Sequence, residues 1–234
     1  MPKVIFKFDK EKDLWNYWYH SNRESSWTNF QVNPKIKEIC EGITLEECKD
    51  VLSTHLSKLH NPKIININLK AVEETWNVIE EEFFRRMNKI MKNEWNEEII
   101  GYLTTLGICP YDHNEPSFMF SLFYSLPKIL QTCGHEIMHL YFHKFYWFDV
   151  EKQIGKEKTA DLKEALTVLL NIEFKDLWFV EDNGYDSHKE LRKFISEEWK
   201  KEKDFKQLLE KCISYLKQPN PSNVTDKTIT KGKN

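Results

Sequence analysis

Long apolar runs are absent from this sequence of 234 residues, which has no stretch of about 18 apolar residues that could cross a membrane as a helix. The N-terminal segment MPKVIFKFDKEKD also lacks an apolar stretch of the length found in signal peptides. The five cysteines are odd in number, scattered and without a CxxC pair, which is typical of reduced thiols rather than a disulfide framework. We therefore expect a cytoplasmic protein with no membrane segment.

An excess of charge of one sign is lacking as well. Acidic and basic residues are interspersed and the formal net charge is −3, which gives no support to nucleic-acid binding as the main activity. Hydrophobic residues make up 40% of the chain and aromatic residues 14%, which is ample for a packed core. No internal repeat is present, and the length suits one sizeable domain with an appendage.

The pattern along the chain divides it into three parts. Residues 1–69 contain a strand candidate at Val4–Phe8 and read as an N-terminal extension of unknown role, packed on the core. Residues 70–217 read as the main domain. Residues 218–234 are polar and aperiodic, which predicts a disordered tail.

The main domain combines helices with strand-like runs. Apolar residues recur at three- and four-residue spacing over 70–95, which predicts a helix. The runs 99–109 and 117–125 are rich in apolar and β-branched residues, and the turn-rich PYDHNEP between them favours an antiparallel pair. Further helices are expected over 126–148, 157–174 and 188–217. The fold class is therefore α+β, with a small antiparallel sheet.

The segment CGHEIMHLYFH (133–143) contains the pattern HExxH. On a helix, a spacing of four places His135 and His139 on one face about 6 Å apart, where both imidazoles can bind one zinc ion. Glu136 would then reach the outer sphere of the metal, where a carboxylate can take a proton from bound water. His143 continues the spacing, but its Cα lies about 12 Å along the axis from that of His135, so we expect a packing or hydrogen-bonding role outside the site.

A third ligand must therefore come from another segment. Glu164 stands in ADLKEALTVLLN (160–171), beside the apolar stripe of a predicted helix. It is either the metal ligand or a carboxylate in a salt bridge at the edge of the core. Asp161, Glu157 and Glu173 are weaker candidates. The histidines at 20, 55, 60 and 113 have no ligand spacing.

HExxH on one helix followed by Glu-Ala-x-Thr on the next resembles the gluzincin class of zinc metallopeptidases, which includes the thermolysin-like enzymes. The sequence is also similar to the HELGHxxxH of phage-repressor-cleaving metallopeptidases of the ImmA/IrrE type. The likeness covers roughly residues 97–175. It implies a zincin-like fold in which an active-site helix and a glutamate helix hold one zinc ion through His135, His139 and Glu164, with Glu136 as general base.

The sequence departs from this class at one position. Thermolysin-like enzymes carry an aspartate four residues after the ligand glutamate, where this chain has Val168. Zinc-binding histidines nearly always need a partner for their second nitrogen. Asn171, Asp161 or a backbone carbonyl are the candidates.

Two further segments have both a functional and a structural interpretation. The turn-like DNGYDSH (182–188) offers Tyr185 and His188 as stabilisers of an oxyanion, or caps the next helix as a surface turn. The strand 117–125 fits a sheet edge that pairs with a peptide substrate, and equally an interior core strand.

The sequence therefore predicts a zinc metallopeptidase that acts on a peptide or protein substrate. The alternative is a catalytically inactive, zincin-derived regulatory or protein-binding module with a structural zinc. A structural site is closed by four protein ligands, whereas a catalytic site keeps a position for water.

Overall fold

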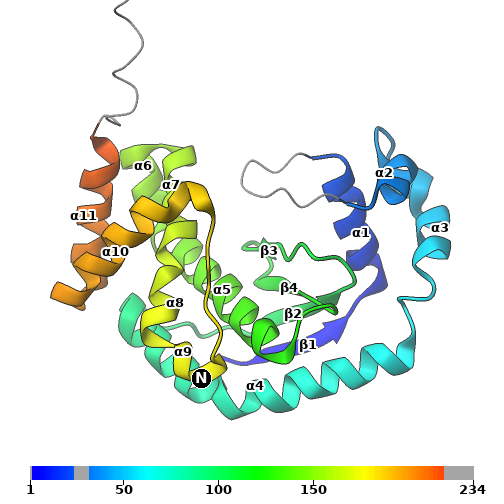
Figure 1. Ribbon diagram of the computed structural model, residues 1–234, viewed down its shortest axis with the longest axis horizontal. Helices are drawn as coiled ribbons and strands as arrows, with labels where there is room; N and C mark the ends of the chain where they lie inside the picture. The colour runs from blue at the N-terminus through cyan, green and yellow to red at the C-terminus, as the bar shows by residue number, and fades with distance from the viewer. Residues whose placement is uncertain (1, 24–31, 219–234) are drawn as a thin grey trace, which may run out of the picture.

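The computed structural model describes residues 2–23 and 32–218, and apart from Gln218 the expected disordered tail lies outside this part of the chain. The fold is α+β, with a small sheet at the centre and helices around it (Figure 1). The strands are β1 (Val4–Phe8), β2 (Ile99–Thr104), β3 (Tyr111–Asp112) and β4 (Ser117–Ser121). The helices are α1 (Lys10–Ser21), α2 (Pro34–Cys40), α3 (Leu45–Leu56), α4 (Pro62–Met91), α5 (Leu126–Phe145), α6 (Trp147–Ile154), α7 (Lys156–Leu166), α8 (Val168–Glu173), α9 (Lys175–Trp178), α10 (Lys189–Lys201) and α11 (Phe205–Lys217), with a 3-10 turn η1 (Asp186–His188).

The sheet is mixed, with the strand order β1-β2-β4-β3. The strand expected at Val4–Phe8 is confirmed and pairs in parallel with β2. The predicted antiparallel pairing of the runs 99–109 and 117–125 is wrong, because β2 and β4 pair in parallel. The turn-rich connector between them supplies the missing strand: β3 runs antiparallel to β4 and turns into it within a few residues. The antiparallel hairpin is therefore β3–β4.

This arrangement also decides the position of strand β4. It is paired with β2 on one side and β3 on the other, and all five of its residues are buried. The alternative of an interior core strand is therefore the one observed. The edges of the sheet in the described part of the chain are β1 and the short β3.

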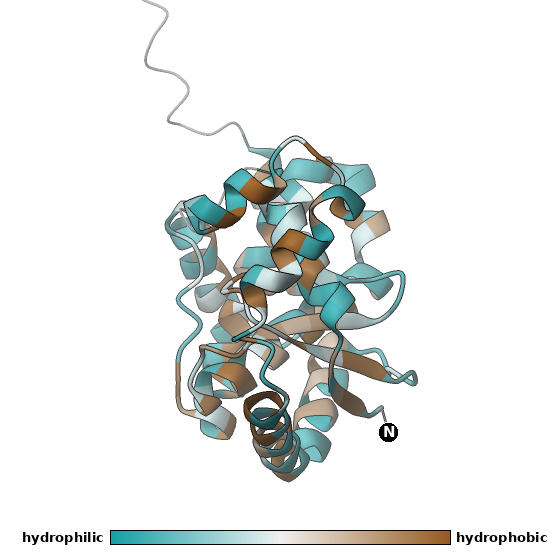
Figure 2. Cartoon of the chain, turned by 90° about the vertical axis from the view of Figure 1, so that its right-hand side faces the viewer, coloured by the Kyte–Doolittle hydropathy of each residue, from teal (hydrophilic) through white to brown (hydrophobic). Residues whose placement is uncertain are grey.

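One face of the sheet carries the main core. Phe6, Gly101 and Phe118 occupy one row across three strands, and a Cβ on Gly101 would lie 2.8 Å from the Phe6 ring. Phe6 also meets Trp76 of α4 with ring centroids 6.2 Å apart. Helices α4 and α5 pack on this face, and Figure 2 shows hydrophobic residues recurring along the helices and strands. This packing fixes α5 against the sheet.

Helix α4 is longer than the sequence pattern predicted. Asn61 caps it by accepting a hydrogen bond from the backbone N–H of Lys63, and Pro62 occupies its first turn. The expected boundary between residues 69 and 70 therefore lies inside a continuous helix. Figure 1 shows α4 passing beneath the sheet and joining the N-terminal helices to the rest of the molecule.

The N-terminal helices form a second apolar cluster of their own, built from α1, α2 and α3 together with Leu106. A buried polar network joins this cluster to the end of β2. The carboxylate of Asp13 accepts hydrogen bonds from Thr104 Oγ1 at 2.6 Å, and from the N–H and Oγ1 of Thr105 at 2.8 and 2.6 Å. His60 Nε2 lies 2.8 Å from the same carboxylate. Because β1 belongs to the central sheet and Asp13 of α1 is bonded to the end of β2, the described part of residues 1–69 is built into the fold.

The C-terminal helices surround α5 on the side away from α1–α3 (Figure 1). The single helix predicted over 157–174 is interrupted at Thr167, whose hydroxyl donates a hydrogen bond to the carbonyl of Glu164 at 2.7 Å. The helix predicted over 126–148 ends at Phe145, where Tyr146 leaves helical geometry. Across the described residues, no helix combines the length and apolarity needed to cross a membrane.

Candidate metal centre

Helix α5 presents the two histidines of the HExxH pattern. The helix is buried along most of its length, and the rings of His135 and His139 lie with centroids 4.3 Å apart, one turn apart on the same face. Gly134 precedes them at a point of close packing, where an added Cβ would lie 2.6 Å from the Trp178 ring. The imidazoles are therefore held by a helix that has little freedom to move.

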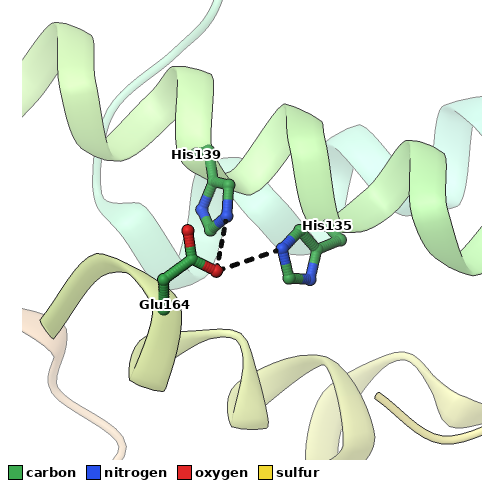
Figure 3. Close-up of side chains that lie close together, drawn as sticks. All are labelled: His135, His139 and Glu164. Atoms are coloured by element: carbon green, nitrogen blue, oxygen red, sulfur yellow. Dashed lines mark ion pairs between the residues drawn. The ribbon is translucent and has the colours of Figure 1, made fainter. Parts of the chain in front are cut away.

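Glu164 of α7 points at both imidazoles (Figure 3). Its Oε2 lies 3.6 Å from His135 Nε2 and 3.3 Å from His139 Nε2. Within the residues that the structure describes, these three form the one group of three or more His, Cys, Asp or Glu side chains with ligand atoms within 4.8 Å of one another. The sequence-predicted ligands are thus brought together from two helices.

These separations fit a tetrahedral zinc ion. Ligand bonds of about 2.0–2.1 Å at tetrahedral angles place neighbouring ligand atoms about 3.3 Å apart, close to the separations found between Glu164 and the two histidines. Two imidazole nitrogens and one carboxylate oxygen are also the donor set of catalytic zinc sites with a fourth, open position. His135, His139 and Glu164 would hold such an ion.

The charges of the three side chains are strongly coupled. Burial opposes protonation of His135, but the charge and hydrogen bond of Asp182 prevail and raise its pKa to about 10. Burial, together with the positive charge of Lys163, lowers the pKa of His139 to about 3. The pKa of Glu164 lies well below its usual value, because His139 and Lys163 outweigh the effect of burial. A metal ion bound here would displace a proton from His135.

Glu136 occupies the position expected of a general base. It is 7% exposed and lines a cavity of about 370 Å³ together with His135. Burial, reinforced by the negative charges of Glu164 and Asp182, raises its pKa to about 7 despite the opposing charge of His135. Its carboxylate makes no hydrogen bond with any described residue. A carboxylate in this state can accept and return a proton near neutral pH.

The partner of the His135 ring is Asp182, a residue that no motif in the sequence pointed to. His135 Nδ1 lies 2.5 Å from Asp182 Oδ2, so the ring turns Nε2 toward Glu164. Asn171, one of the expected candidates, does not contact His135 but holds Asp182. Its Oδ1 accepts a hydrogen bond from the Asp182 N–H at 2.7 Å, and its Nδ2 donates one to the Asp182 carbonyl at 2.8 Å. Asp182 is the first residue of the turn-like segment DNGYDSH. Its place in a turn after the glutamate helix is the only feature of the sequence that could have indicated a partner for His135.

The other candidates in that segment have different surroundings. Tyr185 lines the cavity beside His135 and Glu136. His188 is buried behind it, with the two rings 5.7 Å apart, and its Nε2 lies 3.1 Å from Asp161 Oδ1. His188 is not among the described residues that line the cavity. Asp161 is thus a partner of His188 rather than of His135 or His139.

The remaining histidine and carboxylate candidates lie outside the ligand group. The His143 ring stacks between His113 and Trp147, at centroid distances of 3.7 and 4.5 Å, and its Nδ1 lies 3.3 Å from Tyr111 Oη. This is the packing and hydrogen-bonding role predicted for it. Glu157 is exposed, and Glu173 accepts a hydrogen bond from Trp199 Nε1 at 2.8 Å.

A buried lysine beside the ligand glutamate was also not anticipated. Lys163 is 6% exposed, and its Nζ lies 2.7 Å from Glu164 Oε1 and 4.6 Å from the centre of the Tyr111 ring. The ammonium therefore engages one carboxylate oxygen while the other faces the histidines. In the sequence, a lysine in KEAL has the pattern of an exposed helix position, so its burial could not be seen.

Comparisons with models of protein families, with curated proteins and with solved structures gave no match.

Proposed function

We propose that this protein is a zinc-dependent metallopeptidase with a zincin-like fold, which hydrolyses peptide bonds in a peptide or protein substrate. The observation that carries the proposal is the convergence of His135 Nε2, His139 Nε2 and Glu164 Oε2 on one point, beside a cavity lined by Glu136. The HExxH helix followed by a helix with Glu-Ala, which resembles the gluzincin class, also supports it.

Each side chain of the site has its own role in the proposed hydrolysis. Zinc, when bound by the three ligands, supplies a Lewis acid for the scissile carbonyl and makes bound water more acidic. Glu136, buried and lining the cavity beside His135, would remove the proton from the attacking water and pass it to the leaving amine. Asp182 holds the His135 ring in orientation. Tyr185, from its place in the cavity wall, would donate a hydrogen bond to the oxyanion.

The rival interpretation is an inactive module with a structural zinc. Two features of the sequence favour it: Val168 stands where thermolysin-like enzymes have an aspartate, and residues 1–69 have no known role. Asp182 supplies the missing carboxylate from another loop, and β1 makes the N-terminal segment part of the sheet. Three ligands next to a cavity also favour a site with an open position over one closed by four protein ligands.

The test combines metal analysis with one conservative substitution. Protein purified without chelator should contain about one zinc per chain and cleave members of a broad peptide library. Glu136→Gln should keep the zinc and lose about 100- to 10,000-fold in kcat, because the proton transfer is removed while the ligands remain. The exposed Glu157→Gln is the matched control and should keep full activity. Absence of zinc from the wild type, or full cleavage by Glu136→Gln, would contradict the proposal.

A further inference from the structure

The cavity beside Glu136 contains one positive side chain that the proposed reaction does not use. Helix α5 contributes Lys128, Gln131 and His135 to the cavity lining, and the adjoining loop contributes residues 182–185. Among the described residues that line the cavity, Lys128 is the one lysine or arginine. The proposed reaction gives this cation no role, so its role must be sought elsewhere.

The ammonium of Lys128 has no carboxylate partner in the described part of the chain. Its Nζ donates a hydrogen bond to Gln131 Oε1 at 2.5 Å and lies 5.9 Å from the centre of the Tyr124 ring. An ammonium has three N–H donors, so two remain without an acceptor among the described residues. Among the described residues the ammonium therefore forms no ion pair, and its charge acts on Asp182 only at longer range.

The nearby carboxylate of Asp182 contacts other side chains and not Lys128. Gln131 turns its amide N–H₂ to Asp182 Oδ2 at 3.0 Å, and this places the amide between the carboxylate and Lys128. Asp182 is also bound by His135 at 2.5 Å, and the Arg192 guanidinium lies 3.4 Å from its other oxygen. The arrangement separates the two charges and leaves the ammonium directed at the cavity.

The spacing of Lys128 and His135 along α5 corresponds to about three residues of an extended peptide. Lys128 and His135 are seven residues apart on one face of α5, which places their Cα atoms about 10.5 Å apart along the axis. An extended peptide advances about 3.3 Å per residue. A carboxylate within one to three residues of the cleaved bond therefore comes within range of Lys128.

We infer that the cavity beside Glu136 binds a carboxylate of the substrate through the Lys128 ammonium, so that the enzyme acts preferentially on acidic peptides. The carboxylate belongs to an Asp or Glu side chain or to the C-terminus of the peptide. This inference rests on the proposed function, since it names the substrate class of the same site.

The experiment uses matched fluorogenic peptides that carry Glu, Gln or Lys at each position near the cleaved bond, each with a free or amidated C-terminus. Wild-type protein should cleave the carboxylate-bearing peptide about 10- to 100-fold better in kcat/KM, which corresponds to one charge-assisted hydrogen bond. The preference for Glu over Gln identifies a side chain, and the preference for free over amidated peptide identifies the terminus. Lys128→Met should abolish the preference, Lys128→Arg should retain most of it, and Lys128→Glu should favour the Lys peptide.

The exposed Lys89 on α4 provides the control, and Lys89→Met and Lys89→Glu should leave the preference unchanged. Binding of the same peptides to zinc-loaded Glu136→Gln, measured by fluorescence anisotropy, separates this inference from the proposed catalysis. Lys128-dependent binding without any cleavage by the wild type would leave the carboxylate site standing and reject the peptidase. Equal kcat/KM for Glu, Gln, free and amidated peptides, or an unchanged preference in Lys128→Met, would overturn the inference.

Discussion

Replacement of Asp182 by asparagine should weaken zinc binding although the residue is not one of the three proposed ligands. Its Oδ2 accepts hydrogen bonds from His135 Nδ1 at 2.5 Å and Gln131 Nε2 at 3.0 Å. Its Oδ1 accepts one from the Gly184 N–H at 2.9 Å and faces Arg192. Every one of these neighbours is a donor, so the amide N–H₂ of asparagine opposes donors in either orientation.

The magnitude follows from what the carboxylate does for His135. Its negative charge makes the imidazole a better electron donor and holds Nε2 toward Glu164, and loss of such a partner costs about 10- to 100-fold in metal affinity. That range corresponds to roughly 1.4–2.7 kcal/mol of binding free energy. Asp182→Ala, which removes all the contacts of the side chain, should lie at or beyond the upper end.

The assay is a competition between the protein and a chromophoric chelator, read as the zinc Kd of each variant. Asp186→Asn is the matched control, because this aspartate lies four residues away with a side chain that is 93% exposed. Near-UV circular dichroism of the metal-free variants checks that the fold is retained. A zinc Kd for Asp182→Asn within twofold of the wild type, in a folded protein, would refute the assigned role of the carboxylate.

Two further substitutions probe the surroundings of the site. Gly134→Ala should destabilise the protein by about 1–3 kcal/mol, because its Cβ would lie 2.6 Å from the Trp178 ring and this crowding outweighs the helix propensity of alanine; an unchanged or higher midpoint of urea unfolding would contradict it. Burial, with the charges of His113 and Lys163, lowers the pKa of His143 to about 4, so its stabilising contribution is present above the unfolded pKa of about 6.5 and is lost as the pH falls through 4. Between pH 7 and pH 4, the free energy of unfolding of metal-free His143→Gln should therefore fall by about 1–2 kcal/mol less than that of the wild type, a range that allows for the partial exposure of the ring. If the urea midpoints of the two proteins change identically over this range, the effect is excluded.

The features that could be predicted from the sequence are those set by local spacing. A four-residue interval fixes His135 and His139 on one helix face, and a stripe of leucines places Glu164 beside a core. Asp182 follows no such interval, since it reaches His135 through a loop 47 residues further along the chain. Its position depends on how α8 and α9 fold back, which is a property of the tertiary structure.

The sheet illustrates the same limit. Two apolar runs around a turn-rich segment have the pattern of a hairpin, and the pattern cannot reveal that residues of the turn themselves form β3. Once β3 pairs with β4, the antiparallel position is taken and β2 joins β4 from the other side in parallel. The burial of Lys163 could not be predicted for a related reason. A lysine on a helix is usually exposed to solvent, and the sequence does not show that its ammonium pairs with a carboxylate that is itself buried.

The pairing of β1 with β2 has a consequence for how the chain reaches this structure. Val4 pairs with Ile99, so about 95 residues must be synthesised before the first strand has its neighbour. Helices α1–α3 have most of their apolar contacts among themselves and can assemble earlier, but they too await Leu106. Contacts of such long range slow folding. We expect the group of His135, His139 and Glu164 to form late, after β2 and β4 have joined β1 and given α5 a surface to pack on.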